Sequence, residues 1–156
     1  QKIHKLITSN YERASDLPIS GLAAGPCLLK DAQQLNHKSG NKFTFAQQAI
    51  SVNEGMPYQI ISKIKKHSGS LSGKTVAILG MTFKANDSDV RDSLSFRLKK
   101  YLEHEDANVL ISDPYIQNSL DASEAIENSE IIIVAVNHKE YETINFENKN
   151  IFSLWR

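Results

Sequence analysis

The sequence predicts an α/β fold in which a helical segment is followed by a Rossmann-like parallel-sheet domain. Four apolar runs of strand length occupy residues 75–79, 108–112, 131–136 and 150–154, and helical patterns separate the first three. Strands that alternate with helices form parallel sheets with both faces covered. Before residue 67, apolar residues recur instead at helical spacing.

The helical segment is predicted to contain three helices. Residues 3–11 have the pattern of a helix end, and a loop with two prolines and two glycines follows over residues 15–26. A short helix is expected over residues 28–37, and a longer one over residues 43–66.

The long helix ends at the clearest linker in the sequence. Gly55 and Pro57 are expected to bend or divide this helix, because proline removes a backbone N–H. Residues 68–73 contain three serines and two glycines, which is the composition of a linker. We therefore divide the chain there, into a helical region over residues 1–67 and an α/β domain over residues 73–156.

Two helices are predicted between the strands of the α/β domain. The first runs over residues 93–105, where Ser93 is a suitable N-cap, and the second over residues 121–128. Helical spacing predicts which of their side chains face the core. These positions are Phe96, Leu98, Tyr101 and Leu102 in the first helix, and Ala122, Ala125 and Ile126 in the second.

Charge and composition narrow the functional classes. The 156 residues include 18 basic and 18 acidic side chains, so nothing in the net charge indicates a nucleic acid or an anionic membrane as partner. The longest apolar run, residues 131–136, is too short to span a membrane, and no signal peptide is evident. A single cysteine excludes an intrachain disulfide. We expect a cytoplasmic protein, and the missing initiator methionine indicates part of a longer one.

Cys27 is the first candidate for chemistry. It follows a constrained loop and lies at the predicted start of a helix, where backbone N–H groups and the nearby Lys30 would stabilise a thiolate. Asp31 could act there as an acid or a base. Most free cysteines are small buried packing residues, however, and these residues alone favour that role for Cys27.

The loop over residues 80–92 is the second candidate. Ligands of open parallel sheets bind beyond the carboxyl ends of the strands, and this loop leaves the first strand there. Lys84 and Arg91 could bind phosphate or carboxylate, although a polar loop with solvated charges explains them equally well. The loop lacks the glycine spacing of a dinucleotide-binding turn, which disfavours an independent NAD-binding protein.

Two further polar positions are expected to be structural. His138 follows the third strand and is expected to be a surface histidine. Asp113-Pro114 closes the second strand and needs to be no more than a turn. The histidines and the cysteine lack the spacing of zinc ligands, so no metal site is predicted.

Three short motifs, taken together, resemble those of the UDP-glucose/GDP-mannose dehydrogenase family. Members have an N-terminal NAD-binding Rossmann domain, a central helical dimerisation region and a C-terminal Rossmann-like domain that binds the nucleotide sugar. The resemblance runs from about residue 10 to the end of the chain, in the order of the family. The motifs are Gly25-Pro26-Cys27 with Lys30-Asp31, residues 73–93 with Phe83-Lys84 and an Asp-x-Arg element, and Asp113-Pro114.

The resemblance implies a covalent mechanism. The C6 alcohol of a sugar would be oxidised to an aldehyde, which the Cys27 thiolate would capture as a thiohemiacetal. A second oxidation would give a thioester, and water would release the uronic acid. Asp31 would assist proton transfer or position water, and Lys30 would act electrostatically. With these roles, catalysis becomes the favoured interpretation of Cys27.

The resemblance also implies residues that bind substrate and cofactor. The loop over residues 20–25 would line the sugar, because its glycines allow close backbone approach. Arg91 would reach NAD, most of which would be bound by a domain outside this chain. The substrate-binding residues implied are Gly21, Gly25, Phe83, Lys84 and Arg156.

The parent protein implied is an NAD-dependent dehydrogenase that converts UDP-glucose or a UDP-N-acetylhexosamine to the UDP-uronic acid for polysaccharide biosynthesis. It would be a homodimer, and this chain alone would be inactive. Pro26 departs from the commoner motif, which has two glycines and a serine before the cysteine, and it removes a backbone N–H. This departure keeps a second interpretation open, namely a non-catalytic nucleotide-binding or oligomerisation module of the same fold.

Overall fold

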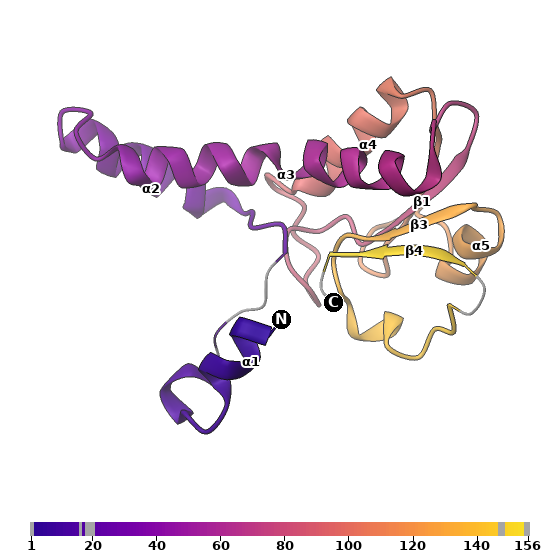
Figure 1. Cartoon of the computed structure of the whole chain (residues 1–156), viewed down its shortest axis with the longest axis horizontal. Helices are drawn as coiled ribbons and strands as arrows, with labels where there is room; N and C mark the ends of the chain where they lie inside the picture. The colour runs from indigo at the N-terminus through magenta and orange to yellow at the C-terminus, as the bar shows by residue number, and fades with distance from the viewer. Residues whose placement is uncertain (1, 16, 18–20, 147–148, 155–156) are drawn as a thin grey trace.

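The computed structural model describes residues 2–15, 17, 21–146 and 149–154. A helical hairpin projects from an α/β body, and the N-terminal helix lies to one side (Figure 1). The expectations for Ser20 and Arg156 lie outside the described residues. No helix within the described ranges is both long enough and apolar enough to cross a membrane.

The helical region contains α1 (Lys2–Thr8), a 3₁₀ turn η1 (Glu12–Ala14), α2 (Pro26–Lys38) and α3 (Thr44–Ser68). α2 begins earlier than predicted because Pro26 occupies its first turn, where the fixed φ of proline suits a helix. α2 and α3 pack against each other and form the projecting hairpin of Figure 1. Among their described residues, α1 and α2 contain none that is buried.

α3 is a single helix of 25 residues, so the expected division at Gly55 and Pro57 is wrong. Pro57 lacks the N–H that would bond to the carbonyl four residues earlier, which costs roughly 3 kcal/mol. The helix continues because its last turns bury Ile60, Ile61 and Ile64 in the core of the α/β domain. Burial of each large aliphatic side chain contributes roughly 1.5–3 kcal/mol, which offsets the loss at the proline.

The α/β domain contains β1 (Thr75–Leu79), α4 (Leu94–His104), β2 (Asn108–Ser112), α5 (Ala122–Glu127), β3 (Ile131–Val134), a 3₁₀ turn η2 (Lys139–Tyr141) and β4 (Asn150–Ser153). The four strands form one sheet in the order β2-β1-β3-β4, and all neighbours are parallel. The prediction of a parallel-sheet domain after a helical segment is confirmed.

The sheet separates two hydrophobic cores. Val76 and Ile78 of β1 contribute to the core shared with α3 and α4, whereas Ala77 and Leu79 contribute to the core shared with α5. Both faces of the sheet are therefore covered, as predicted. β1 is buried on both sides, which explains its continuous apolar sequence.

The predicted core of α4 is half correct. Leu98 and Leu102 are buried, whereas Phe96 and Tyr101 are 38% and 36% exposed, so their prediction as core residues is wrong. The helix buries every fourth residue, beginning at Leu94, and Phe96 points away from this stripe while Tyr101 lies at its edge. In α5 the prediction is confirmed for Ala125 and Ile126, which are buried, and for Ala122, which packs against that core.

The order of the strands places a crevice at one edge of the sheet. β2 lies on one side of β1 and β3 on the other, and ligands of such folds bind where the order switches, at the carboxyl ends of the strands. Gly80 lies at this edge with a φ of 90°, and a Cβ atom there would come within 2.5 Å of the Val136 side chain. Glycine therefore lets the loops after β1 and β3 touch at this point.

Gly80→Ala should lower the free energy of unfolding by about 3 kcal/mol, because a methyl group would meet Val136 in a backbone conformation that alanine disfavours. Gly55→Ala is the matched control. Apart from the chain neighbours and the backbone of the helix itself, no described atom lies within 4 Å of a Cβ at that helical position, and alanine should stabilise the protein by roughly 0.5–1 kcal/mol. Urea denaturation measures both changes, and similar values for the two variants would contradict the close approach at Gly80.

Candidate functional site

Cys27 lies in the first turn of α2, directly after Pro26, and its side chain is exposed. It is therefore not a buried packing residue in this fold. Lys30 and Asp31 follow on the same helix, with 3.8 Å between the Lys30 Nζ and Asp31 Oδ1 atoms, and both side chains are mostly exposed. The thiol is thus open to molecules that approach the start of α2, where the N–H groups of the first turn favour an anion.

The loop before Cys27 packs on the loop that follows β1. Gly25 is buried with a φ of 117°, and a Cβ atom at this position would lie 3.1 Å from two carbons of the Phe83 ring. Absence of a side chain at Gly25 therefore allows the aromatic ring to lie against the backbone. Two of the predicted substrate-binding residues, which are far apart in the sequence, are in direct contact.

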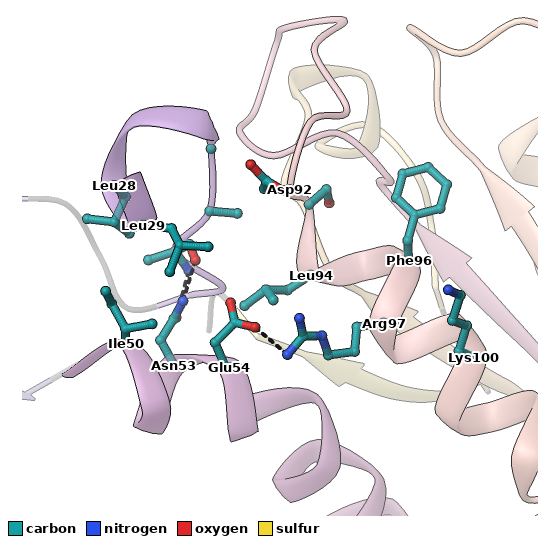
Figure 2. A pocket seen from close by; sticks show the side chains of 14 residues that line it. Leu28, Leu29, Ile50, Asn53, Glu54, Asp92, Leu94, Phe96, Arg97 and Lys100 are labelled. Atoms are coloured by element: carbon teal, nitrogen blue, oxygen red, sulfur yellow. Dashed lines mark hydrogen bonds and ion pairs between the residues drawn. The ribbon is translucent and has the colours of Figure 1, made fainter. Parts of the chain in front are cut away.

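A second contact fixes the same loop from the side of α3. The Asn53 side chain accepts a hydrogen bond from the N–H of Ala23 at 3.2 Å and donates one to the carbonyl oxygen of Ala23 at 2.5 Å. Figure 2 shows Asn53 reaching from α3 toward this loop. An amide that satisfies both polar groups of one residue restricts the position and the orientation of the backbone.

Lys84 extends from the loop after β1 into solvent. Its Nζ atom lies 5.5 Å from the centre of the Phe83 ring and 3.0 Å from the Asp87 carboxylate. A main-chain hydrogen bond from Asp89 and the ammonium group of Lys84 hold the pKa of Asp87 below its usual value. The lysine is 59% exposed, so an anionic ligand can reach it.

Arg91 is paired with Asp89 on the same loop. Its Nε atom lies 3.0 Å from both oxygens of the carboxylate, and its Nη2 atom lies 2.6 Å from Oδ2. This pairing raises the pKa of Arg91 and lowers that of Asp89. A Cys27 thiolate would add a smaller electrostatic attraction to Arg91, which puts the candidate nucleophile and the candidate cofactor residue in one neighbourhood.

A cavity of about 240 Å³ lies between the start of α2, the middle of α3 and the start of α4 (Figure 2). An ion pair between Glu54 of α3 and Arg97 of α4 spans it. The cavity adjoins the Cys27 loop, because Gly25 and Leu28 contribute to its wall. The other lining residues are Ala23, Ala24, Leu29, Ile50, Asn53, Asp92, Ser93, Leu94, Phe96 and Lys100.

Another cavity, of about 330 Å³, lies beside the carboxyl end of β4. Gly21 and Leu22 form part of its wall, and Lys63 of α3 contributes a charge. The predicted substrate residue Gly21 therefore borders a cavity at the carboxyl end of β4. The remaining lining residues are Met56, Ile60, Phe152, Ser153 and Leu154.

Asp113 is buried, and it does more than end a turn. Its carboxylate accepts hydrogen bonds from the N–H groups of Met81 at 2.6 Å, Thr82 at 3.1 Å and Tyr115 at 2.9 Å. Burial alone would raise the pKa of Asp113. Hydrogen bonds from His138 and from the main chain outweigh it, so the pKa lies below its usual value.

His138 is fully buried, so its prediction as a surface residue is wrong. Its Nε2 atom lies 3.1 Å from the Asp113 carboxylate, and its Nδ1 atom accepts the N–H of Asn86 at 3.0 Å. The ring also contacts the rings of Tyr115 and Tyr141. A histidine can be buried here because both of its nitrogens have partners.

The sequence positions of Asp113 and His138 could have indicated that the two side chains lie together. Asp113 directly follows β2, and His138 lies shortly after β3, so both follow strands that flank β1. Polar residues in those places meet the loop after β1, which has candidate ligand residues. Within the described ranges, no three His, Cys, Asp or Glu side chains gather closely enough to hold a metal ion.

Comparison with known proteins identifies the family. The family model described as the UDP binding domain of the UDP-glucose/GDP-mannose dehydrogenase family matches residues 77–152. The chain is 32% identical, over 154 residues, to the UDP-N-acetyl-D-mannosamine dehydrogenase of Methanocaldococcus jannaschii, and the match covers 94% of this chain and 35% of that protein. The chain belongs to the UDP-glucose/GDP-mannose dehydrogenase family.

Other members of the UDP-glucose/GDP-mannose dehydrogenase family match over most of the chain. The UDP-glucose 6-dehydrogenase of Rickettsia conorii is 29% identical over 143 residues, which cover 79% of this chain and 32% of that protein. The structure of a UDP-glucose dehydrogenase from Pyrobaculum islandicum has the same fold, with a TM-score of 0.86, 22% identity, and coverage of 99% of this chain and 40% of that chain. The chain spans about a third of the length of the relatives it matches in sequence.

Asp113→Asn should reduce the free energy of unfolding by about 1–3 kcal/mol near neutral pH, because His138 and the main-chain N–H groups would lose a charged acceptor in a buried site. The pKa of Asp113 is depressed by folding, so its carboxylate stabilises the fold above the usual value of 3.8, and this contribution is lost as the pH falls through the folded pKa. Urea denaturation across the acid range should therefore show a steeper loss below pH 3.8 for the wild type than for the variant. If the free energy of unfolding fell equally with pH in both proteins, the Asp113 carboxylate would not be the group that stabilises the fold.

Proposed function

We propose that the chain is the C-terminal part of an NAD-dependent dehydrogenase that oxidises UDP-glucose or a UDP-N-acetylhexosamine to the UDP-uronic acid, for polysaccharide biosynthesis. One contact carries the proposal. Gly25, two residues before the exposed Cys27, lies against Phe83 beyond the carboxyl end of β1. This contact supports an exposed thiol near the edge of the sheet at which folds of this kind bind ligands. Relatives named as UDP-sugar dehydrogenases support the substrate class.

The nucleotide sugar is proposed to bind across the contact between the two loops. Lys84 offers an exposed ammonium group that can exchange its Asp87 partner for a diphosphate. The Phe83 ring offers an apolar surface beside it. The proposed substrate residues are Gly21, Gly25, Phe83, Lys84 and Arg156.

Cys27 is proposed to be the nucleophile. After oxidation of the C6 alcohol to an aldehyde, its thiolate adds to the aldehyde carbon, and the carbonyl oxygen takes up a proton to give a thiohemiacetal. Transfer of a hydride from the same carbon to NAD, together with loss of the hydroxyl proton to a base, gives a thioester. Water then attacks, the carbon–sulfur bond breaks, and the uronate is released with the thiol restored. Asp31 is proposed to transfer protons in these steps, and Lys30 to stabilise negative charge.

NAD accepts the hydride in each of the two oxidations when it is bound. Arg91 is the residue of this chain proposed to contact it, because its guanidinium is 70% exposed and can attract a diphosphate while Asp89 holds the Nε side. The loop after β1 lacks a glycine-rich dinucleotide turn. We therefore propose that a domain outside this chain holds most of the cofactor, and that the chain alone is inactive.

The complete protein is proposed to be a homodimer in the cytoplasm, with the helical region over residues 1–67 in the interface and residues 73–156 as the UDP-sugar domain. The helices present large apolar side chains to solvent, which a second subunit would bury. Those with more than 60% exposure are Ile3, Leu6, Phe45, Val52 and Tyr58.

Lys84→Ala should weaken UDP binding about tenfold, because it removes a charge-assisted hydrogen bond worth about 1.4 kcal/mol. Calorimetric titration of the chain with UDP, UDP-glucose, UDP-N-acetylglucosamine and NAD measures the affinities and ranks the sugars. Lys38→Ala is the matched control, since this exposed lysine lies at the other end of α2 from Cys27. Equal affinities for the two variants would remove Lys84 from the site.

Iodoacetamide should alkylate Cys27 readily near neutral pH, and saturating UDP-glucose or UDP-N-acetylglucosamine should slow the reaction about fivefold or more by covering the exposed thiol. Mass spectrometry of the modified chain measures both rates. A thiol that no nucleotide sugar protects would favour the non-catalytic module, to which Pro26 also gives support because it removes a backbone N–H directly before the cysteine. In the complete protein, full double oxidation by a Cys27→Ser variant would contradict the covalent mechanism.

A further inference from the structure

The buried His138 ring joins the loop after β1 to the loop after β3. On one side, its Nδ1 atom accepts the N–H of Asn86 at 3.0 Å. On the other side, its Nε2 atom lies 3.1 Å from the Asp113 carboxylate and 3.2 Å from the Thr82 hydroxyl. The ring is fully buried, and the mechanism proposed above leaves it without a role.

The partners of His138 determine where its proton lies. Nδ1 faces an N–H donor and therefore carries no hydrogen, so the proton belongs on Nε2 and points toward the Asp113 carboxylate. The Thr82 hydroxyl in turn donates to the carbonyl oxygen of Lys84 at 3.0 Å. The ring thus accepts the Asn86 N–H directly at one end of a five-residue segment, and it bonds to Asp113, which accepts the N–H of Thr82 at the other end.

Asn86 strengthens this connection. Its side-chain oxygen accepts the N–H of Lys139 at 3.0 Å, next to His138 in the chain. Its φ is 58°, a left-handed conformation that asparagine adopts more readily than most residues with a side chain. The two hydrogen bonds to residues 138–139 add to this preference and tie the turn at Asn86 to the histidine loop.

The segment held in this way contains Phe83 and Lys84. Phe83 lies against Gly25, and Lys84 extends into solvent beside it. A binding residue on a loop fixed at both ends loses little conformational entropy when a ligand arrives. The hydrogen bonds of the loop therefore hold Phe83 and Lys84 in place before the nucleotide sugar binds.

We propose that His138 is a positioning residue for the nucleotide sugar: through its bond to Asn86 it fixes the loop that presents Phe83 and Lys84, without touching the ligand. This inference rests on the proposed function, in which Phe83 and Lys84 contact a UDP-sugar. It assigns distinct tasks to the two nitrogens of one ring. Nδ1 holds the loop, and Nε2 satisfies Asp113.

Two substitutions separate these tasks. His138→Asn places an amide oxygen near the position of Nδ1, where it can still accept the Asn86 N–H, but it leaves Asp113 without its donor. His138→Gln extends an amide N–H toward Asp113 and loses the acceptor for Asn86. His104→Gln, at the exposed end of α4, is the matched control.

Calorimetric titration with UDP should show about tenfold weaker binding for His138→Gln, and less than about threefold weaker binding for His138→Asn and His104→Gln. Melting temperatures of all four proteins provide the structural comparison. The proposal is supported if UDP affinity falls only in the variant that loses the acceptor for the Asn86 N–H, whatever the melting temperatures of the two His138 variants. It is overturned if His138→Gln binds as the wild type does, or if the affinities of both His138 variants fall in proportion to their stability.

Amide hydrogen exchange at Asn86 tests the role of His138 without any need for UDP to bind. The Asn86 amide should exchange faster in His138→Gln and remain protected in His138→Asn. Failure of the wild type to bind UDP would contradict the proposed function, while exchange would still decide whether His138 holds the loop. Equal exchange in the two variants would overturn the role of Nδ1.

Discussion

The carboxylate of Asp113 holds together the edge of the sheet on which the candidate site depends. A buried charge of this kind is stable only where donors surround it. Here the donors are the main chain after β1, the main chain after β2 and the ring of His138 after β3. Three loops that are distant in the sequence therefore converge on one side chain. The loop that carries Phe83 and Lys84 gains its shape from this convergence.

α3 connects that edge to the loop before Cys27. At its middle, Asn53 binds both polar groups of Ala23, and a few turns later Ile60 and Ile64 enter the core against the sheet. The position of the thiol relative to Phe83 is thus set by one helix and one aromatic contact. Neither contact involves Lys30 or Asp31, whose side chains are mostly exposed.

Much of the fold could be predicted because strands and helices leave local periodic patterns, and the strands of the sheet begin where their apolar runs begin. The errors concern contacts between distant residues. Pro57 stays within a helix because of burial further along, and Phe96 is exposed because α4 packs on one narrow stripe. In the site, spacing alone could not reveal that Gly25 meets Phe83. Nor could it show that His138 is buried, since its partners lie 25 to 56 residues away.

The two halves of the continuous α3 helix differ in how much apolar surface they bury. Its buried residues lie between Pro57 and Ile64, whereas the first half packs mainly against α2, a helix without buried residues in the described structure. Local opening requires little free energy where few apolar contacts are broken. We therefore expect the C-terminal turns of α3 to unfold only with the sheet, and its N-terminal turns to open more readily, together with α2. Cys27 lies in the part of the chain that is expected to open more readily.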